Sequence, residues 1–109
     1  MKSEAIMVLT TVSKHPEALR LGRTLLEARL AACVQIEEIF SLYRWEGEIH
    51  EEPEWRLLIK STPERYEELR TLLERLHPYK TPQIVALEAD RVSEAYGRWL
   101  RECTASDPE

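Results

Sequence analysis

The sequence of 109 residues contains only three glycines, Gly22, Gly47 and Gly97, and they lie far apart. The two common phosphate-binding motifs, G-x-G-x-x-G and G-x-x-x-x-G-K-[ST], place glycines close together so that backbone amides can surround a phosphate. Neither motif can be assembled from these three positions. The sequence therefore excludes the usual glycine-rich nucleotide sites.

A surplus of basic residues is also missing. Fifteen Lys and Arg against twenty Asp and Glu give a formal net charge of −5, whereas nucleic-acid-binding proteins usually carry a basic stripe that faces the phosphates. The string of aromatic residues that stacks bases on RNA-binding strands is absent as well. We therefore predict no nucleic-acid partner.

Cysteines and long apolar runs are scarce. Cys33 and Cys103 are far apart and neither forms a C-x-x-C motif, which argues against a paired-cysteine zinc site and against a disulfide scaffold. The apolar opening stretch, residues 5–12, is too short to cross a bilayer and lacks the flanks of a signal peptide. The expectation is a cytoplasmic protein with reduced thiols and no membrane partner.

The length suits one domain over residues 1–109. Four segments have the composition or the alternation of β-strands: residues 5–12, 33–45, 49–60 and 83–89. Amphipathic helices are predicted after Ser13, from Thr62-Pro63 to His77-Pro78, and after a capping Ser93. Residues 104–109 are polar and are predicted to fray.

The order strand, helix, strand, strand, helix, strand, helix predicts an α+β fold. It is the order of a ferredoxin-like sandwich, with the helices on one face of an antiparallel sheet. The second and third strands form a long hairpin that turns at Glu46-Gly47. Pro53 cannot donate a hydrogen bond to a neighbouring strand, so it marks either a bulge or an edge position.

The hairpin has too many apolar residues for one buried face. Two sets alternate along it: Tyr43, Trp45 and Trp55, and Phe40, Leu42, Leu57 and Leu58. Only one set can lie under the helices, and a small domain seldom exposes the other without a partner. Arms of about fifteen residues would also project beyond a domain of this size. We expect the hairpin to lie across a neighbouring subunit; the alternative is that sheet twist buries the rings internally.

Several strings along the chain resemble the CutA family of divalent-cation tolerance proteins. They are Leu30-Ala31-Ala32-Cys33-Val34, residues 41–49 (SLYRWEGEI), Leu58-Ile59-Lys60-Ser61, residues 77–84 (HPYKTPQI), and Tyr96 with Trp99-Leu100. The match runs in order over about residues 5–102. Together these strings are specific to the family.

This resemblance implies a homotrimer of ferredoxin-like subunits whose hairpins wrap around their neighbours, with an architecture like that of the PII signalling proteins. It also implies a role in tolerance to copper and other divalent metals. By position, Tyr43, Trp45 and Trp55 are expected at the trimer interface. The apolar residues of the hairpin independently predict a partner subunit, in agreement with this resemblance.

His77 is the first candidate metal ligand, because a neutral imidazole binds Cu²⁺ well. Some relatives have a second His directly before it and a Cys near the end of the first strand. Here those positions are Leu76 and Thr10, so the ligand set is incomplete. The alternative is that His77 caps the C-terminus of its helix.

Cys33 is the second candidate, since a thiolate suits Cu(I). A buried free cysteine more often packs as a small hydrophobic residue, and Cys103 is assigned to packing. The third candidate is the acidic hairpin end, residues 46–54, with five glutamates and no Lys or Arg. Strand alternation would place four possible ligands of a loose cation site on one side: Glu46, Glu48, His50 and Glu52. The alternative is that these charges prevent edge-to-edge aggregation.

The leading hypothesis is a non-enzymatic trimer that binds Cu²⁺ or another divalent cation weakly and has no organic cofactor. No G-x-S-x-G motif or Ser-His-Asp arrangement supports catalysis. Two rivals stay open. One is a PII-like regulatory module that binds a small anion in the clefts between subunits through Arg44, Lys60 and Lys80. The other is a structural trimer that serves as a scaffold for partner proteins.

Overall fold

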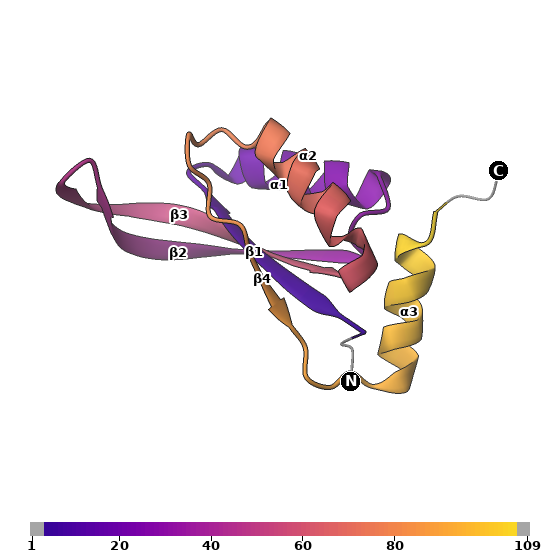
Figure 1. The fold of residues 1–109 in the computed structure, drawn as a ribbon. Helices are drawn as coiled ribbons and strands as arrows, with labels where there is room; N and C mark the ends of the chain where they lie inside the picture. The colour runs from indigo at the N-terminus through magenta and orange to yellow at the C-terminus, as the bar shows by residue number, and fades with distance from the viewer. Residues whose placement is uncertain (1–3, 107–109) are drawn as a thin grey trace.

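Residues 4–106, which this computed structural model describes, fold into a four-stranded sheet and three α-helices (Figure 1). The elements are β1 (Ile6–Val12), α1 (His15–Glu27), β2 (Cys33–Trp45), β3 (Glu48–Ser61), a 3₁₀ turn (Pro63–Arg65), α2 (Tyr66–Leu76), β4 (Val85–Glu88) and α3 (Glu94–Thr104). The strand predicted at residues 83–89 is thus shorter than expected. Within the described range, no helix combines the length and the apolar character needed to cross a membrane.

The strand order is β2-β3-β1-β4, and every neighbouring pair is antiparallel. This order, with one helix after β1 and another after β3, confirms the predicted ferredoxin-like α+β fold. β3 pairs with β2 from Glu48 to Lys60, but with β1 only from Trp55 to Ser61. The part of the hairpin beyond Trp55 is therefore a two-stranded ribbon.

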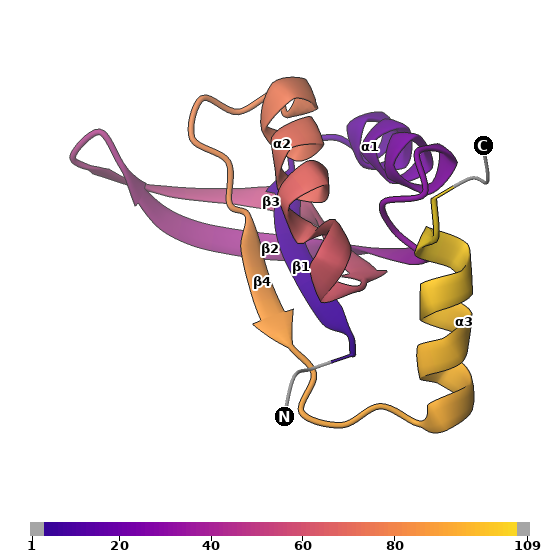
Figure 2. The same ribbon diagram turned by 45° about the vertical axis from the view of Figure 1, so that its right-hand side comes forward.

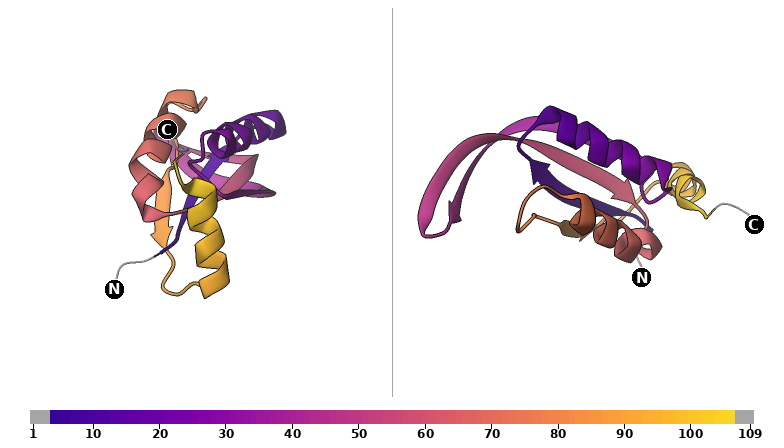
Figure 3. Two further views of the ribbon diagram at one scale, coloured as in Figure 1. Left: turned by 90° about the vertical axis from the view of Figure 1, so that its right-hand side faces the viewer. Right: turned by 90° about the horizontal axis from the view of Figure 1, so that it is seen from above.

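The core lies between the sheet and two helices. α1 and α2 run side by side over one face of the sheet in both turned views (Figures 2 and 3). The largest fully buried apolar side chains at this contact are Leu21 and Leu25 of α1, Leu69 and Leu73 of α2, and Val8, Leu57 and Ile59 of the sheet. Their spacing of four on the helices and of two on β3 selects one stripe and one sheet face.

α3 does not share this face, so the prediction that all helices cover one side is wrong. β4 runs antiparallel to β1 and ends with Glu88 opposite Ile6, which places the start of α3 at the end of the sheet where β1 begins. Figure 1 shows α3 apart from α1 and α2. One contact between α3 and the sheet is that of Tyr96 with Lys60 of β3, whose Nζ lies over the Tyr96 ring, 5.7 Å from the ring centroid.

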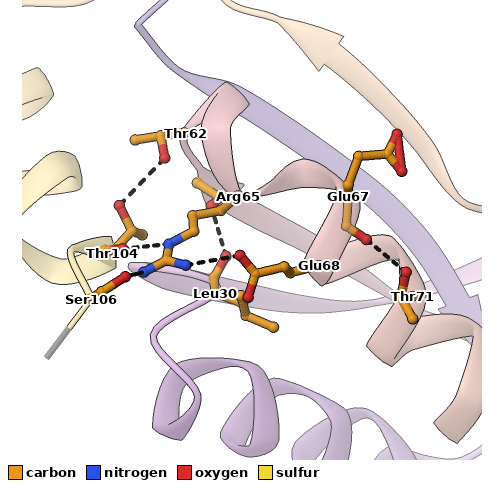
Figure 4. A network of polar contacts seen from close by, with 9 residues as sticks. Leu30, Thr62, Arg65, Glu67, Glu68, Thr71, Thr104 and Ser106 are labelled. Atoms are coloured by element: carbon orange, nitrogen blue, oxygen red, sulfur yellow. Dashed lines mark hydrogen bonds and ion pairs between the residues drawn. The ribbon is translucent and has the colours of Figure 1, made fainter.

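The end of α3 is held by Arg65 at the start of α2 (Figure 4). The guanidinium donates to the Thr104 carbonyl oxygen at 2.6 Å, to the Ser106 hydroxyl at 2.7 Å and to Glu68 at 3.0 Å. Thr104 is therefore buried and is the last residue of α3. The prediction that residues 104–109 form a frayed tail is wrong at Thr104. Residues 107–109 of that prediction lie outside the described residues.

The helix starts agree only in part with the predicted caps. The Ser93 hydroxyl accepts a hydrogen bond from the Tyr96 amide, which confirms that cap. α1 is preceded by Lys14, and the Ser13 hydroxyl donates to Glu17 instead of capping. The reason is Pro16: it has no amide hydrogen at the position where a Ser13 cap would find its donor.

The hairpin turn falls at Glu46-Gly47 as predicted. Both residues have positive φ, 49° and 79°, as a type I′ hairpin turn requires. The pairing of β2 with β3 is unbroken from Cys33 opposite Lys60 to Trp45 opposite Glu48, so there is no bulge at Pro53. Pro53 lies where β3 has no second neighbour, which confirms its edge position.

Truncation of the core should be costly. Leu73→Ala removes a fully buried side chain (0% exposed), and we expect the free energy of unfolding to fall by about 2–5 kcal/mol. The measurement is urea denaturation at a fixed protein concentration. The matched control is Leu26→Ala on α1, where the side chain is 41% exposed and the expected loss is below about 1 kcal/mol. Equal losses in the two variants would contradict this core.

Candidate functional site

The hairpin beyond Trp55 exposes apolar side chains on both of its faces. Phe40, Leu42 and Ile49 are 63%, 64% and 67% exposed, and they lie on the face that carries α1 and α2 further along the sheet. Tyr43 and Trp45 lie on the opposite face. Figure 3 shows the ribbon extending beyond the helices. The helices therefore leave Phe40, Leu42 and Ile49 largely exposed.

Trp55 differs from the other two predicted interface residues. It is half-buried, packs against the core and lies 4.5 Å from the ring of His15, measured between ring centroids. The core and His15 of α1 therefore cover part of the Trp55 ring within its own chain. Tyr43 and Trp45, in contrast, are 38% and 37% exposed.

The acidic hairpin end is only partly arranged as predicted. Glu48, His50 and Glu52 share one face with Tyr43, whereas Glu46 lies in the turn. The Tyr43 ring stacks on His50 at 5.5 Å, and its hydroxyl donates to Glu52. This hydrogen bond, followed by partial desolvation and by the charges of Glu52 and Glu54, raises the pKa of Tyr43 to about 12. Tyr43 is therefore a neutral hydrogen-bond donor over the whole physiological pH range.

Glu54 is separate from that exposed cluster. Its side chain is buried, with 6% exposure, and accepts a hydrogen bond from the Tyr79 hydroxyl at 2.6 Å. Burial first, and then this hydrogen bond, raise the pKa of Tyr79 well above its usual value. Glu54 therefore ties the base of the hairpin to the loop after α2.

His77 follows α2 and is buried, with 8% exposure. Its backbone amide donates to the Leu73 carbonyl and ends the helix. The ring turns to β1: Nδ1 accepts a hydrogen bond from the Tyr79 amide at 3.1 Å, and Nε2 lies 3.0 Å from the Thr10 hydroxyl oxygen. Since Nδ1 is an acceptor, the neutral ring carries its hydrogen on Nε2 and donates it to Thr10. Burial lowers the pKa of His77, which favours this neutral form.

This geometry speaks against a nucleophile and base pair at Thr10 and His77. A general base must accept the hydroxyl proton at Nε2, but here Nε2 is the donor. Thr10 is also fully buried, so a substrate has no access to its hydroxyl. The hydrogen bond between Thr10 and His77 joins β1 to the end of α2 and has a structural role.

The metal-ligand candidates do not meet in one subunit. Both His77 nitrogens are engaged, so the ring has no free lone pair for a cation. Cys33 is half-buried at the far end of the hairpin, opposite Lys60, and Cys103 is half-buried on α3. Within residues 4–106 no three His, Cys, Asp or Glu side chains form a group that could hold a metal ion.

Sequence reasoning missed the buried chain of contacts from Glu54 through Tyr79 to His77 and Thr10. Glu54 was counted with the exposed glutamates, because its neighbours in the sequence are also acidic. Tyr79 belongs to the HPY string, and its position two residues after a histidine was the one available signal. The contact with β1 joins residues distant in sequence, so no local pattern could reveal it.

The strand order and the projecting ribbon define the class of protein: a ferredoxin-like α+β protein with an extended β2–β3 hairpin. Residues 6–103 match the family described as CutA1 divalent ion tolerance protein. The chain belongs to this family, as its sequence strings predicted.

Its relatives span nearly its full length. The chain is 45% identical over 97 residues to the divalent-cation tolerance protein CutA of Thermotoga maritima, covering 89% of this chain and 96% of that protein. It is 42% identical over 99 residues to the CutA of Thermus thermophilus, covering 90% and 96%. The crystal structure of CutA1 from Pyrococcus horikoshii superposes with a TM-score of 0.90 at 37% identity, covering 93% of this chain and 99% of that one.

The neutral His77 ring predicts a specific loss of stability in acid. Because the folded-state pKa of His77 lies below its unfolded value, its contribution is complete above about pH 6.5 and is lost as the pH falls through the folded pKa. We expect the unfolding free energy of His77→Gln to fall less than that of the parent between pH 7.5 and pH 5. Parallel curves from denaturant titrations would contradict a buried neutral imidazole.

Proposed function

We propose that this protein works as a non-enzymatic homotrimer that binds divalent cations, copper first, and so contributes to metal tolerance. The observation that supports the assembly is the ribbon of residues 39–54, where Phe40, Leu42 and Ile49 stay largely exposed among the residues that the structure describes. Exposure of Phe40, Leu42 and Ile49 to water is unfavourable, and burial of these side chains against a partner surface would lower the free energy. The number three and the PII-like arrangement come from the CutA resemblance.

Two further surfaces support association with copies of the chain. The outer strands β2 and β4 each have one neighbour only, so each presents a free edge at an opposite side of the sheet. On β4, Val85 and Leu87 are 44% and 48% exposed. A contact between unlike edges closes into a ring when the rotation between subunits allows it.

Light scattering coupled to size exclusion tests the assembly. The parent should have about three times the chain mass of 12.8 kDa. Leu42→Lys places a charge in the exposed apolar row, so this variant should elute with a lower mass while keeping its fold by circular dichroism. Leu26→Lys is the matched control, because Leu26 is an exposed leucine on α1, outside the ribbon, and should leave the mass unchanged. A parent mass of 12.8 kDa would contradict the proposal.

The proposed cation ligands are Glu48, His50 and Glu52. They are exposed or half-exposed on one face of a segment with no Lys or Arg, and carboxylates with an imidazole suit Cu²⁺ and similar ions. Among residues 4–106 these three side chains do not form a group that could hold an ion, so the proposal requires further ligands from the hairpin of an adjacent subunit. Glu52 would also have to give up its hydrogen bond from the Tyr43 hydroxyl. His77 and Cys33 rank second, because His77 would first have to give up its bond to the Tyr79 amide.

Isothermal titration with Cu²⁺ separates the candidates. The triple variant Glu48→Gln, His50→Gln, Glu52→Gln should bind at least about tenfold more weakly than the parent. Its control changes three exposed glutamates elsewhere, Glu27→Gln, Glu64→Gln and Glu102→Gln, and should retain the parent affinity. Equal affinities in the two triple variants would rule out the hairpin end. A loss in His77→Gln alone would move the site to His77.

Binding of one small anion by Arg44, Lys60 and Lys80 together has less support within one chain. Arg44 pairs with Ile49 near the tip of the hairpin, while Lys60 is at the other end of β3. Eleven residues of strand separate these levels, about 35 Å. Arg44 and Lys60 therefore cannot contact one small ligand in the same subunit.

A further inference from the structure

A pocket lies between the start of β1, the end of β3 and the first turns of α3, far from the hairpin tip. Its volume is about 300 Å³, at the lower end of the range for small-molecule sites. Its walls are mainly apolar, with Met7, Val92 and Leu100 beside the ring of Tyr96. Two cationic side chains, Lys60 and Arg91, also line it.

Lys60 is held on a central strand of the sheet. It pairs with Met7 of β1 on one side and Cys33 of β2 on the other. Its neighbours Ile59 and Ser61 are buried under α1 and α2, so alternation directs Lys60 to the opposite face. There its ammonium lies 5.7 Å from the centroid of Tyr96. Both the position and the direction of this charge are thus set by the fold.

This ammonium has no anionic partner among residues 4–106. The ion pairs near it are made by other groups: Glu4 pairs with Arg101 at 3.6 Å, and Asp90 pairs with Arg91 at 3.8 Å. The ammonium is thus available to pair with an anion held in the pocket. The ring of Tyr96 supplies only a weak cation–π contact.

We propose that this pocket binds a small organic anion with a flat apolar body. The body would lie along Met7, Leu100 and the Tyr96 ring, and a carboxylate would face the Lys60 ammonium. Arg91, which is 95% exposed and lies 3.8 Å from Asp90, is at the mouth, and its charge is partly offset by that carboxylate. This site is distinct from the cation site proposed at the hairpin and does not depend on it.

Benzoate is a suitable probe, followed by NMR chemical-shift titration of the full chain. We expect saturable shifts at the amides of Met7, Ala89 and Tyr96. Benzyl alcohol, which has a similar body without the charge, should bind at least tenfold more weakly. Lys60→Met, which keeps the chain length but removes the charge, should weaken benzoate binding at least tenfold. Lys80→Met, on the exposed loop before β4, is the control and should bind like the parent.

Lys60→Arg keeps the charge and should stay within about threefold of the parent, which guards against a variant that only disturbs the fold. No saturable shift with benzoate, or equal benzoate binding by Lys60→Met and the parent, would overturn the proposal. The mass of each sample is measured alongside. A Lys60→Met variant whose assembly has a lower mass in solution, but which still binds benzoate like the parent, would show that Lys60 pairs with a neighbouring subunit instead. That result would overturn the pocket proposal and leave the assembly proposal intact.

Discussion

The pairing of β2 with β3 is the constraint on which the rest of the structure depends. Because its register is unbroken over thirteen pairs from Cys33 to Trp45, it sets the face of every residue on both strands. At one end, β3 also pairs with β1, and the same alternation buries Leu57 and Ile59 under the helices. At the other end β1 has stopped, and the alternation leaves apolar side chains in solvent on both faces. The same pairing of β2 with β3 thus builds part of the core and creates the exposed apolar surface of the hairpin.

The buried contacts around His77 show how a candidate ligand can have a structural role. A histidine at the end of a helix in a metal-tolerance family invites assignment to the metal. In this chain the ring accepts from the Tyr79 amide and donates to Thr10, so its two nitrogens already stabilise the junction of α2, β1 and the following loop.

Membership of the CutA family constrains function less tightly than it constrains the fold. The family description connects the chain to divalent ions, yet among residues 4–106 no three His, Cys, Asp or Glu side chains form a group that could hold such an ion. Two features remain for function: an acidic ribbon end that carries the whole negative surplus of the chain, and a lysine in an apolar pocket beside α3. They are at opposite ends of the molecule and carry opposite charge, so they suit different ligands.

The sequence by itself determined the element types, the strand order, the Glu46-Gly47 turn and the family, because these depend on local periodicity, turn chemistry and contiguous strings. It also determined that the hairpin has more apolar residues than one face can bury. Only the tertiary structure decided that Trp55 packs internally while Tyr43 and Trp45 do not, that Glu54 is buried, that α3 leaves the face of the other helices, and that the His77 ring is fully engaged. Each of these depends on contacts between residues distant in sequence. Such contacts are set by where strands end and how the sheet is covered, which no local pattern specifies.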